Sequence, residues 1–224
     1  QEKLATIGQI AGSIAHELGN PLGAVKQSAF FLKRLYHKQQ LRASNPKVKE
    51  HLDLIETELN TSERVISDLL QMTRMTPPHR KQTDLRPIIV DAVERCHLPE
   101  KVQFTIALHS DPFLVWVDPS QLRQVLINLL TNSVQAINEK GNITVRAKSL
   151  SQDKVSVIEI EDTGIGIEPD AHNKVFEPLY TTKSTGTGLG LSICKQLIER
   201  HNGHISIRSE KEQGTIVTIV LPNQ

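Results

Sequence analysis

A histidine, a carboxylate and an amide stand within little more than one helical turn near the start of the chain: His16, Glu17 and Asn20. The apolar neighbours Ile14 and Leu18 belong to a helical seam, so we expect His16 to project away from the core, with Asn20 on its face. Imidazole, whose unperturbed pKa is about 6.5, is largely neutral near pH 7 and can attack phosphorus. A carboxylate can accept the proton of the other ring nitrogen as that bond forms. The alternative is an ordinary surface histidine, one of nine.

A second group consists of two asparagines four residues apart, Asn128 and Asn132, in an otherwise apolar helical stretch. This spacing places both amides on one face of a helix. An amide oxygen suits Mg²⁺, which keeps several waters and shares its remaining positions with nucleotide phosphates. The pair is therefore a candidate site for a metal and a nucleotide. A pair of helix-surface asparagines remains the alternative.

Two glycine-rich segments follow, Asp162-Thr163-Gly164-Ile165-Gly166-Ile167 and Gly186-Thr187-Gly188-Leu189-Gly190-Leu191. In the first, the glycines let the backbone approach a ligand, and the carboxylate can accept a hydrogen bond from an adenine amine. Alone it is a weak signal, because glycine turns after strands are common. The second opens a helix, whose first N–H groups form an anion site suited to phosphates. It has neither the Walker nor the dinucleotide spacing, which disfavours P-loop and Rossmann enzymes.

A threonine-rich stretch with one lysine, Thr181-Thr182-Lys183-Ser184-Thr185, stands between the two glycine segments. Its composition is typical of a loop. Lys183 could contact a terminal phosphate once such a loop closes over a nucleotide. A solvated loop with an incidental lysine is the alternative.

The apolar spacing that must position His16 is that of a helical hairpin. Apolar residues recur at steps of three and four from Leu4 to Tyr36, and again from Val48 to Leu69 after a polar turn. Two helices cannot enclose both seams, so we expect a homodimer in which two hairpins form a four-helix bundle. A hairpin that packs on the second domain is the alternative.

After Pro77-Pro78 the pattern changes to alternating strands and helices. Asp118-Pro119-Ser120-Gln121 predicts a helix start with an N-cap, a proline at the first position and a capping-box glutamine. The order predicts an α/β sandwich with helices on one face of a mixed sheet. The expected helices are 85–96, 119–137 and 189–201, and the expected strands are 103–108, 113–117, 142–149, 155–161, 204–209 and 215–221. We therefore predict a helical hairpin (1–76), a linker (77–83) and a nucleotide-binding domain (84–224).

Composition excludes several classes. The 26 Lys and Arg residues nearly balance the 25 Asp and Glu residues. The protein therefore lacks the overall positive charge that dominates non-specific binding to nucleic acids. With only two cysteines, Cys96 and Cys194, the chain is not a disulfide-stabilised secreted protein. We therefore expect it to be located in the reducing cytoplasm. No apolar run approaches the roughly 18–20 residues that span a bilayer, so we expect no membrane contact within this fragment. Gln1-Glu2-Lys3-Leu4 is already helical in character, as in a piece of a longer chain.

Taken together and in this order, the motifs resemble those of the sensor histidine kinase family over essentially the whole chain. Residues 13–22 resemble its H box, 126–137 its N box, 162–167 its first glycine box, 175–183 its F box and 186–191 its second glycine box. The sequence Thr-Thr-Lys at 181–183 and the residue Gln135 resemble those of the subgroup that includes nitrogen-regulation sensor kinases. Gln135 replaces a basic residue of many relatives, and Asn202-Gly203 stands where relatives often carry two glycines.

The resemblance implies a dimeric four-helix bundle followed by an α/β sandwich. It implies an ATP-dependent protein-histidine kinase of a two-component system, which phosphorylates itself and then an aspartate in the receiver domain of a response regulator. It makes His16 the phosphoacceptor, Glu17 its proton acceptor and Asn20 a residue for dephosphorylating the regulator. With ATP and Mg²⁺ as cofactors, Asn132 becomes the metal ligand. The implied nucleotide-binding set is Asn128, Asn132, Asp162, Gly164, Gly166, Tyr180, Lys183, Gly186, Thr187, Gly188, Leu189 and Gly190.

Two other classes compete with this interpretation. The nucleotide domain also resembles gyrase and MutL ATPases, which carry a glutamate four residues before the magnesium asparagine to activate water. Here that position is Asn128, which cannot act as a base near neutral pH. A non-enzymatic dimeric scaffold would predict damaged glycine boxes or the loss of His16, and the sequence has neither.

Overall fold

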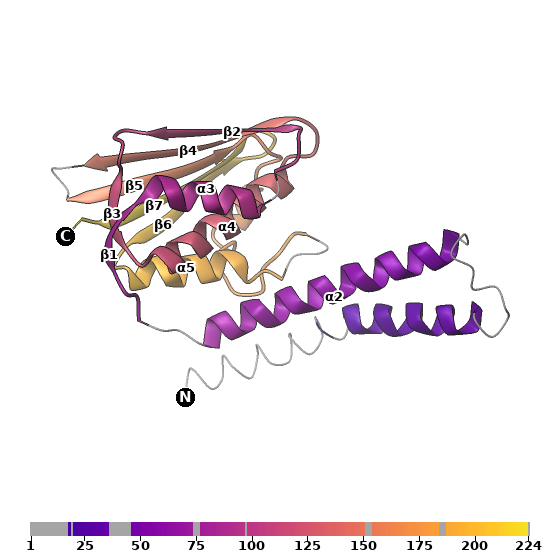
Figure 1. The fold of residues 1–224 in the computed structure, drawn as a ribbon. Helices are drawn as coiled ribbons and strands as arrows, with labels where there is room; N and C mark the ends of the chain where they lie inside the picture. The colour runs from indigo at the N-terminus through magenta and orange to yellow at the C-terminus, as the bar shows by residue number, and fades with distance from the viewer. Residues whose placement is uncertain are drawn as a thin grey trace. The chain divides into compact units, whose positions relative to one another are not determined.

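The computed structural model describes residues 18, 20–35, 46–73, 77–96, 98–150, 154–183 and 187–223 (Figure 1). The chain divides into two compact units. One is helical and comprises residues 1–74 with 181–187, and the other is an α/β unit of residues 75–180 and 188–224. Within the described ranges, no helix combines the length and apolarity needed to cross a bilayer.

The helical unit contains a helix at residues 20–35 and the long helix α2 (Pro46–Thr73). Ser28 lies in the contact between them, where its Oγ is 3.2 Å from Nδ1 of His51. The ring of His51 also packs on Phe31, with centroids 4.3 Å apart. The two predicted helices are thus present in the described ranges and contact each other through these side chains.

The inner face of the first helix differs from the predicted seam. Leu22, which the periodicity placed in the seam, is 52% exposed, whereas Pro21 and Ser28 are buried. Leu35 continues this inner face, seven residues after Ser28. The predicted seam was expected to close only in a dimeric bundle, so it stays a prediction; a helix with two apolar stripes has a periodicity that does not say which stripe a given neighbour covers.

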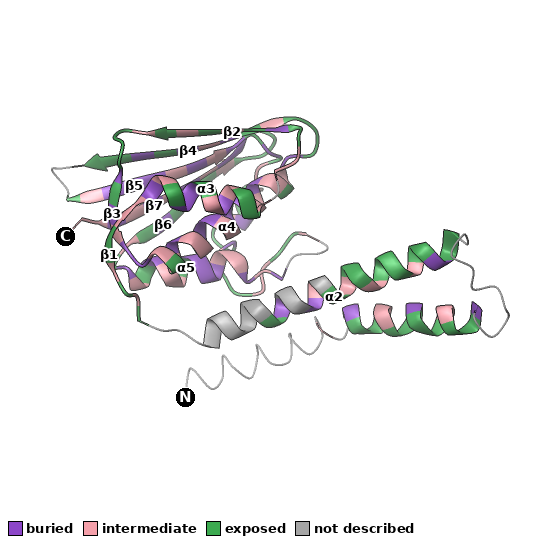
Figure 2. Cartoon of the chain, in the orientation of Figure 1, coloured by how far each residue is buried: buried purple, intermediate pink, exposed green. Residues whose placement is uncertain are grey.

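The α/β unit has a five-stranded sheet in the order β2-β4-β5-β7-β6. β2 pairs parallel with β4, and all the other pairs are antiparallel. The helices cover one face of this sheet, and their apolar sides meet its inward residues in a common core (Figures 1 and 2). The mixed sheet with helices on one face confirms the predicted sandwich. The helices are α3 (Leu85–Arg95), α4 (Pro119–Ala136) and α5 (Gly190–Arg200), and the strands are β2 (Val102–Leu108), β4 (Gly141–Leu150), β5 (Val155–Asp162), β6 (His204–Glu210) and β7 (Gly214–Pro222).

A short strand occupies part of the segment predicted as linker. β1 (Lys81–Asp84) pairs antiparallel with β3 (Leu114–Val117) in a separate two-stranded sheet. Its four polar residues show no apolar alternation, so nothing local predicts a strand, and only the pairing with β3 creates it. A 3₁₀ turn, η1 (Pro169–Ala171), was also not predicted.

Asp118 caps α4 as predicted, but the expected capping box is not formed in the predicted way. Its carboxylate accepts hydrogen bonds from the N–H groups of Ser120 and Gln121 at 2.9 and 3.2 Å. Its own N–H, which a capping-box glutamine would bind, donates instead to Nε2 of His201 at 3.0 Å. The acceptor comes from the end of α5, 83 residues away, which no local pattern could indicate.

Candidate functional site

The two asparagines of α4 lie on a row of side chains at steps of four. Asn128 donates from Nδ2 to the carbonyl of Gly190 at 3.5 Å, at the start of α5. Eight residues further on, Ala136 accepts at its carbonyl a hydrogen bond from Ile165 N–H at 3.0 Å. Both asparagines are half-buried. Because residues four apart share a helix face, Asn132 stands between a contact with the second glycine segment and a contact with the first.

The first glycine segment lies against the C-terminal end of α4. Asp162 ends β5, is 5% exposed, and accepts the N–H of Gly164 at 2.9 Å. A Cβ on Gly164 would stand 2.6 Å from the Cβ of Ala136, so only glycine allows this close approach. The buried carboxylate is thereby held at the strand end beside the helix that carries Asn132.

The second glycine segment leads into α5. Gly188 has a φ of +66°, and a Cβ there would lie 2.4 Å from the carbonyl carbon of Leu179. Leu179 N–H donates to the carbonyl of Gly188 at 3.0 Å, which ties the segment to the end of the predicted F box. Leu189 is the N-cap of α5, and a leucine side chain cannot cap the first N–H groups of the helix. Such a helix start suits an anion.

These residues fit a nucleotide with a magnesium ion. Among the described residues, the nearest atoms to a hypothetical Cβ on Gly190 are those of the Asn128 amide at 4.0 Å, so these residues leave room at the helix start. Among the residues that the structure describes, no group of three or more His, Cys, Asp or Glu side chains could hold a metal ion. The donor set suited to Mg²⁺ is thus an amide completed by phosphates and water, as Asn132 offers.

The remaining predicted residues are not all described. His16, Glu17 and Gly186 lie outside the described residues, and Asn20 is exposed on its helix. Tyr180 is half-buried, and its N–H donates to the carbonyl of Glu177 at 3.3 Å.

Lys183 and Thr187 belong to the segment 181–187, which groups with the helical unit. The N–H of Lys183 donates to Oγ1 of Thr181 at 3.1 Å, and Thr187 is buried. Their roles at phosphates stay predictions.

The prediction did not include Thr215. It is the second residue of β7, after Gly214, and pairs with Asp162 of β5, where both residues are buried. A polar residue directly opposite the buried aspartate is a further candidate for the base-binding side of the site. Its only local signal is the Gly-Thr dipeptide at a strand start, so sequence alone does not connect it with Asp162.

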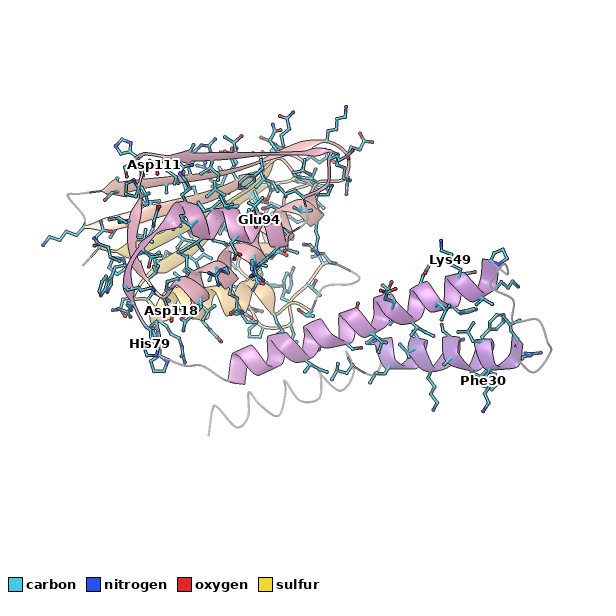
Figure 3. The ribbon with its side chains drawn as sticks, in the orientation of Figure 1. Phe30, Lys49, His79, Glu94, Asp111 and Asp118 are labelled. Atoms are coloured by element: carbon cyan, nitrogen blue, oxygen red, sulfur yellow. The ribbon has the colours of Figure 1, made fainter. Side chains whose placement is uncertain are left out.

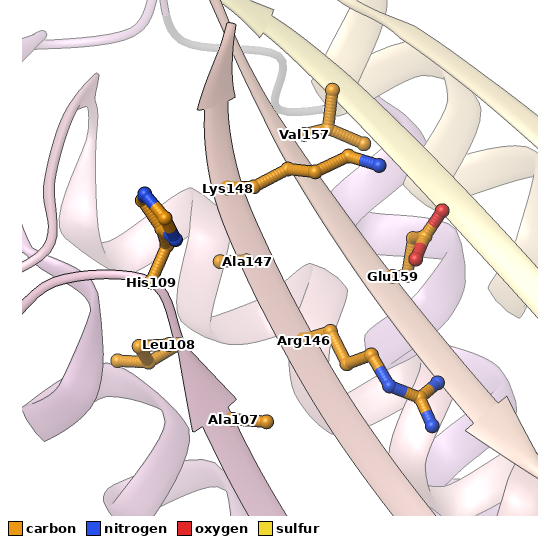
Figure 4. Close-up of a pocket in the computed structure, with 8 residues that line it drawn as sticks. All are labelled: Ala107, Leu108, His109, Arg146, Ala147, Lys148, Val157 and Glu159. Carbon is orange, nitrogen blue, oxygen red and sulfur yellow. The ribbon is translucent and has the colours of Figure 1, made fainter.

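A shallow pocket of about 300 Å³ lies elsewhere, over β2, β4 and β5 (Figure 4). Its lining includes His109, Lys148 and Glu159, together with Arg146, which forms an ion pair with Glu161. None of the predicted site residues lines it, so it does not contribute to the nucleotide site.

Two family models match the chain. Residues 6–78 match the His Kinase A (phospho-acceptor) domain, and residues 117–224 match the Histidine kinase-, DNA gyrase B-, and HSP90-like ATPase. The signal transduction histidine-protein kinase AtoS of Escherichia coli K12 is 33% identical over 99% of this chain and 36% of its own length. The sensor histidine kinase ZraS of Salmonella typhi is 33% identical over 99% of this chain and 47% of its own. The chain thus spans about a third to a half of these relatives.

Solved structures agree with the fold. The mycobacterial sensor histidine kinase MprB matches 65% of this chain and 98% of its own with a TM-score of 0.58 and 27% identity. The histidine kinase ThkA, in a complex with the response regulator protein TrrA, matches 100% of this chain and 64% of its own with a TM-score of 0.78 and 23% identity. With an ATPase domain and a phosphoacceptor domain in one chain, and with relatives of this kind along its whole length, the chain belongs to the two-component sensor histidine kinases and carries their catalytic core.

Proposed function

We propose that this chain transfers the γ-phosphoryl group of ATP to His16 and then to an aspartate in the receiver domain of a response regulator. The observation that carries the proposal is the row on α4, where Asn132 stands between the contacts of Asn128 with Gly190 and of Ala136 with Ile165. A phosphoacceptor model matches residues 6–78 of the same chain. The complex of ThkA with a response regulator supports the choice of partner.

Phosphoryl transfer asks mainly for positioning and charge stabilisation. Bound Mg²⁺ would neutralise charge on the phosphates. In the proposed step, an imidazole nitrogen of His16 forms a bond to the γ-phosphorus as the bond to the bridging oxygen breaks and ADP leaves. Glu17 takes the proton of the other ring nitrogen. Asn132 would hold the metal, Asp162 would accept a hydrogen bond from the adenine amine, and Lys183 and the N–H groups at the start of α5 would each bind phosphate oxygens.

Hydrolysis of ATP by the gyrase route is the weaker candidate. Asn128 occupies the position at which those enzymes carry a catalytic glutamate, and it directs its amide nitrogen to the carbonyl of Gly190. A neutral amide used as a donor cannot remove a proton from water.

The helical unit supports a homodimer. α2 leaves Leu52, Leu59 and Ile66 exposed at steps of seven, while Val48 and Ser62 of the same helix are buried. An apolar stripe with this spacing is typical of a helix seam, and a second copy of the hairpin would cover it in a four-helix bundle. On the first helix, the 69% exposed Phe30 lies on the side away from α2 (Figure 3).

Four finer assignments belong to the same proposal. Asn20 would orient water for dephosphorylating the partner, so Asn20→Ala should slow that reaction and leave autophosphorylation intact. The proposed domains are 1–76, a linker at 77–83 and 84–224, with the end of the linker tied to the α/β unit by the pairing of β1 with β3. The site of action is the cytoplasm, and the closest functional subgroup is that of nitrogen-regulation sensor kinases.

The test is incubation of the chain with γ-labelled ATP and Mg²⁺. We expect label on the protein that is lost in acid and kept in base, as for a phosphohistidine. His16→Ala should abolish labelling while calorimetric titration still detects ATP binding. Label that survives acid, or labelling of the His16→Ala variant, would contradict the proposal.

A further inference from the structure

The turn between β6 and β7, taken with the strand ends that flank it (residues 209–215), is bonded to the first glycine segment. Glu212 N–H donates to the carbonyl of Ile165 at 2.7 Å, and Ile167 N–H donates to Oγ of Ser209 at 2.9 Å. An ion pair of 2.7 Å joins Lys211 to Glu168. These bonds hold the segment from both sides of Gly166.

Two glycines bring the same segments into direct backbone contact. A Cβ on Gly166, at φ +69°, would lie 2.0 Å from the carbonyl oxygen of Glu210. A Cβ on Gly214, at φ +93°, would lie 2.0 Å from the carbonyl oxygen of Asp162. Because both contacts leave no room for a side chain, the turn and the loop that follows Asp162 form one rigid assembly.

Ser209 connects the parts of this assembly through its hydroxyl group. It donates to the carbonyl of Gly214 at 2.8 Å and accepts from the N–H of Ile167 at 2.9 Å. The hydroxyl of Thr215 is also 2.9 Å away. A serine hydroxyl has one proton to donate, so Thr215 is the donor in this third bond. Ser209 therefore orients both the Ile167 amide and the hydroxyl of the residue opposite Asp162.

We propose that Ser209 is a positioning residue for the base-binding side of the nucleotide site. This inference rests on the proposed function, because it assumes that Asp162 faces adenine. Ser209 need not touch the nucleotide: it acts by holding the loop after Asp162 and the Thr215 hydroxyl in one arrangement. Its loss should weaken recognition of the base and leave the phosphate side, at Asn132 and the start of α5, unchanged.

The experiment compares Ser209→Ala, the isosteric pair Ser209→Thr and Ser209→Val, and the control Ser206→Ala. Ser206 is an exposed serine on the same strand. Calorimetry would measure binding of ATP and of inorganic tripolyphosphate to the whole chain, and hydrogen exchange would follow the Ile167 amide. We expect the Ala and Val variants to bind ATP about threefold to tenfold more weakly, as for one lost hydrogen bond. The affinity for tripolyphosphate and the kcat of autophosphorylation at saturating ATP should stay within about twofold of the parent values.

The Thr variant and the control should bind ATP like the parent protein, and the Ile167 amide should exchange faster only in the Ala and Val variants. Unchanged ATP affinity in those two variants would overturn the inference, as would an equal loss for ATP and tripolyphosphate. Misfolding of both hydroxyl-free variants would assign Ser209 to folding and also overturn it. A parent chain that does not bind ATP would instead refute the proposed function.

Discussion

At the scale of single residues, Asn132 stands in the middle of the row on α4 that meets both glycine segments. Asn132→Asp keeps the size of the side chain but adds a negative charge where phosphates are expected. We predict that autophosphorylation falls by about 100-fold, the scale of losing one preorganised polar contact to a reacting group. The matched control is Asn138→Asp, an exposed residue just after α4. Labelling with γ-labelled ATP measures both variants, and equal labelling of Asn132→Asp and the parent would remove Asn132 from the site.

His201 predicts a dependence of stability on pH. It is 2% exposed, donates from Nδ1 to the carbonyl of Leu197 at 2.8 Å, and accepts the N–H of Asp118 at Nε2. Burial lowers the pKa of His201, and the positive charge of Arg80 acts in the same direction, whereas the Leu197 carbonyl and the Asp118 carboxylate oppose them. The folded protein therefore keeps the imidazole neutral.

Since the unfolded chain binds the His201 proton more readily, stability should fall as the pH drops below about 6.5 toward the folded pKa. The slope from this group is at most about 1.4 kcal/mol per pH unit. Thermal unfolding at pH 7.5 and 5.5 should show a smaller loss for His201→Asn than for the parent. The variant should be less stable than the parent at pH 7.5. A parallel loss in both proteins would show that another group is responsible.

At the scale of elements, the start of α4, the end of α5 and the residues just before β1 meet around Asp118. Its carboxylate accepts the N–H of His79 at 2.9 Å in addition to capping α4 (Figure 3). Arg80 also donates to the carbonyl of Arg200, at the end of α5. Burial acts to raise the pKa of Asp118, but hydrogen bonds from Ser120, His79 and Gln121 together hold it below its ordinary value. The residues just before β1 are thus fixed to the α/β unit.

We predict that Asp118→Ala lowers the stability of the α/β unit by about 1–3 kcal/mol, because it removes a helix cap and leaves buried N–H groups without an acceptor. Asp118→Asn should cost less, since its amide oxygen still accepts. Urea unfolding followed by circular dichroism measures both. Equal costs for the two variants would mean that the charge, rather than the capping oxygen, carries the effect.

The junction of α4 with the first glycine segment gives a sharper prediction. Gly164→Ala places a methyl group 2.6 Å from the Cβ of Ala136 and must displace the segment from the helix. We expect ATP affinity to fall about tenfold or more, the cost of misplacing a preorganised site by roughly an ångström. Gly23→Ala is the control, because no atom of the described residues lies within 4 Å of its added methyl group. Titration calorimetry with ATP tests this prediction. An unchanged ATP affinity of the Gly164→Ala variant would contradict the proposed placement of adenine beside Asp162.

At the scale of the whole molecule, the exposed apolar stripe of α2 predicts self-association. Leu59 is 45% exposed in the single chain, and Leu59→Lys would bury a charge in the proposed bundle. We predict a shift from dimer to monomer in light scattering, together with a loss of autophosphorylation. The control is Thr57→Lys, which adds the same charge at an exposed polar position of the same helix. A Leu59→Lys variant that remains dimeric would place the contact elsewhere.

The chemical groups and the order of the elements could be predicted from local patterns. The Asp118 cap, the helix at Pro119–Ala136 and the alternating strands depend on neighbours within a few residues, and the structure confirms them. β1 could not be predicted, because its polar residues become a strand only by pairing with β3. Which face of the first helix meets α2 could not be predicted for the same reason, because its partner is another helix.

The sequence by itself determined which side chains could do chemistry and on which elements they stand. Only the tertiary structure decided that Ala136 meets the first glycine segment, that Thr215 faces Asp162, and that His201 replaces the expected glutamine at Asp118. Each of these contacts joins residues far apart along the chain. Their placement follows from strand register and helix packing, which depend on the whole core rather than on any local spacing of residues.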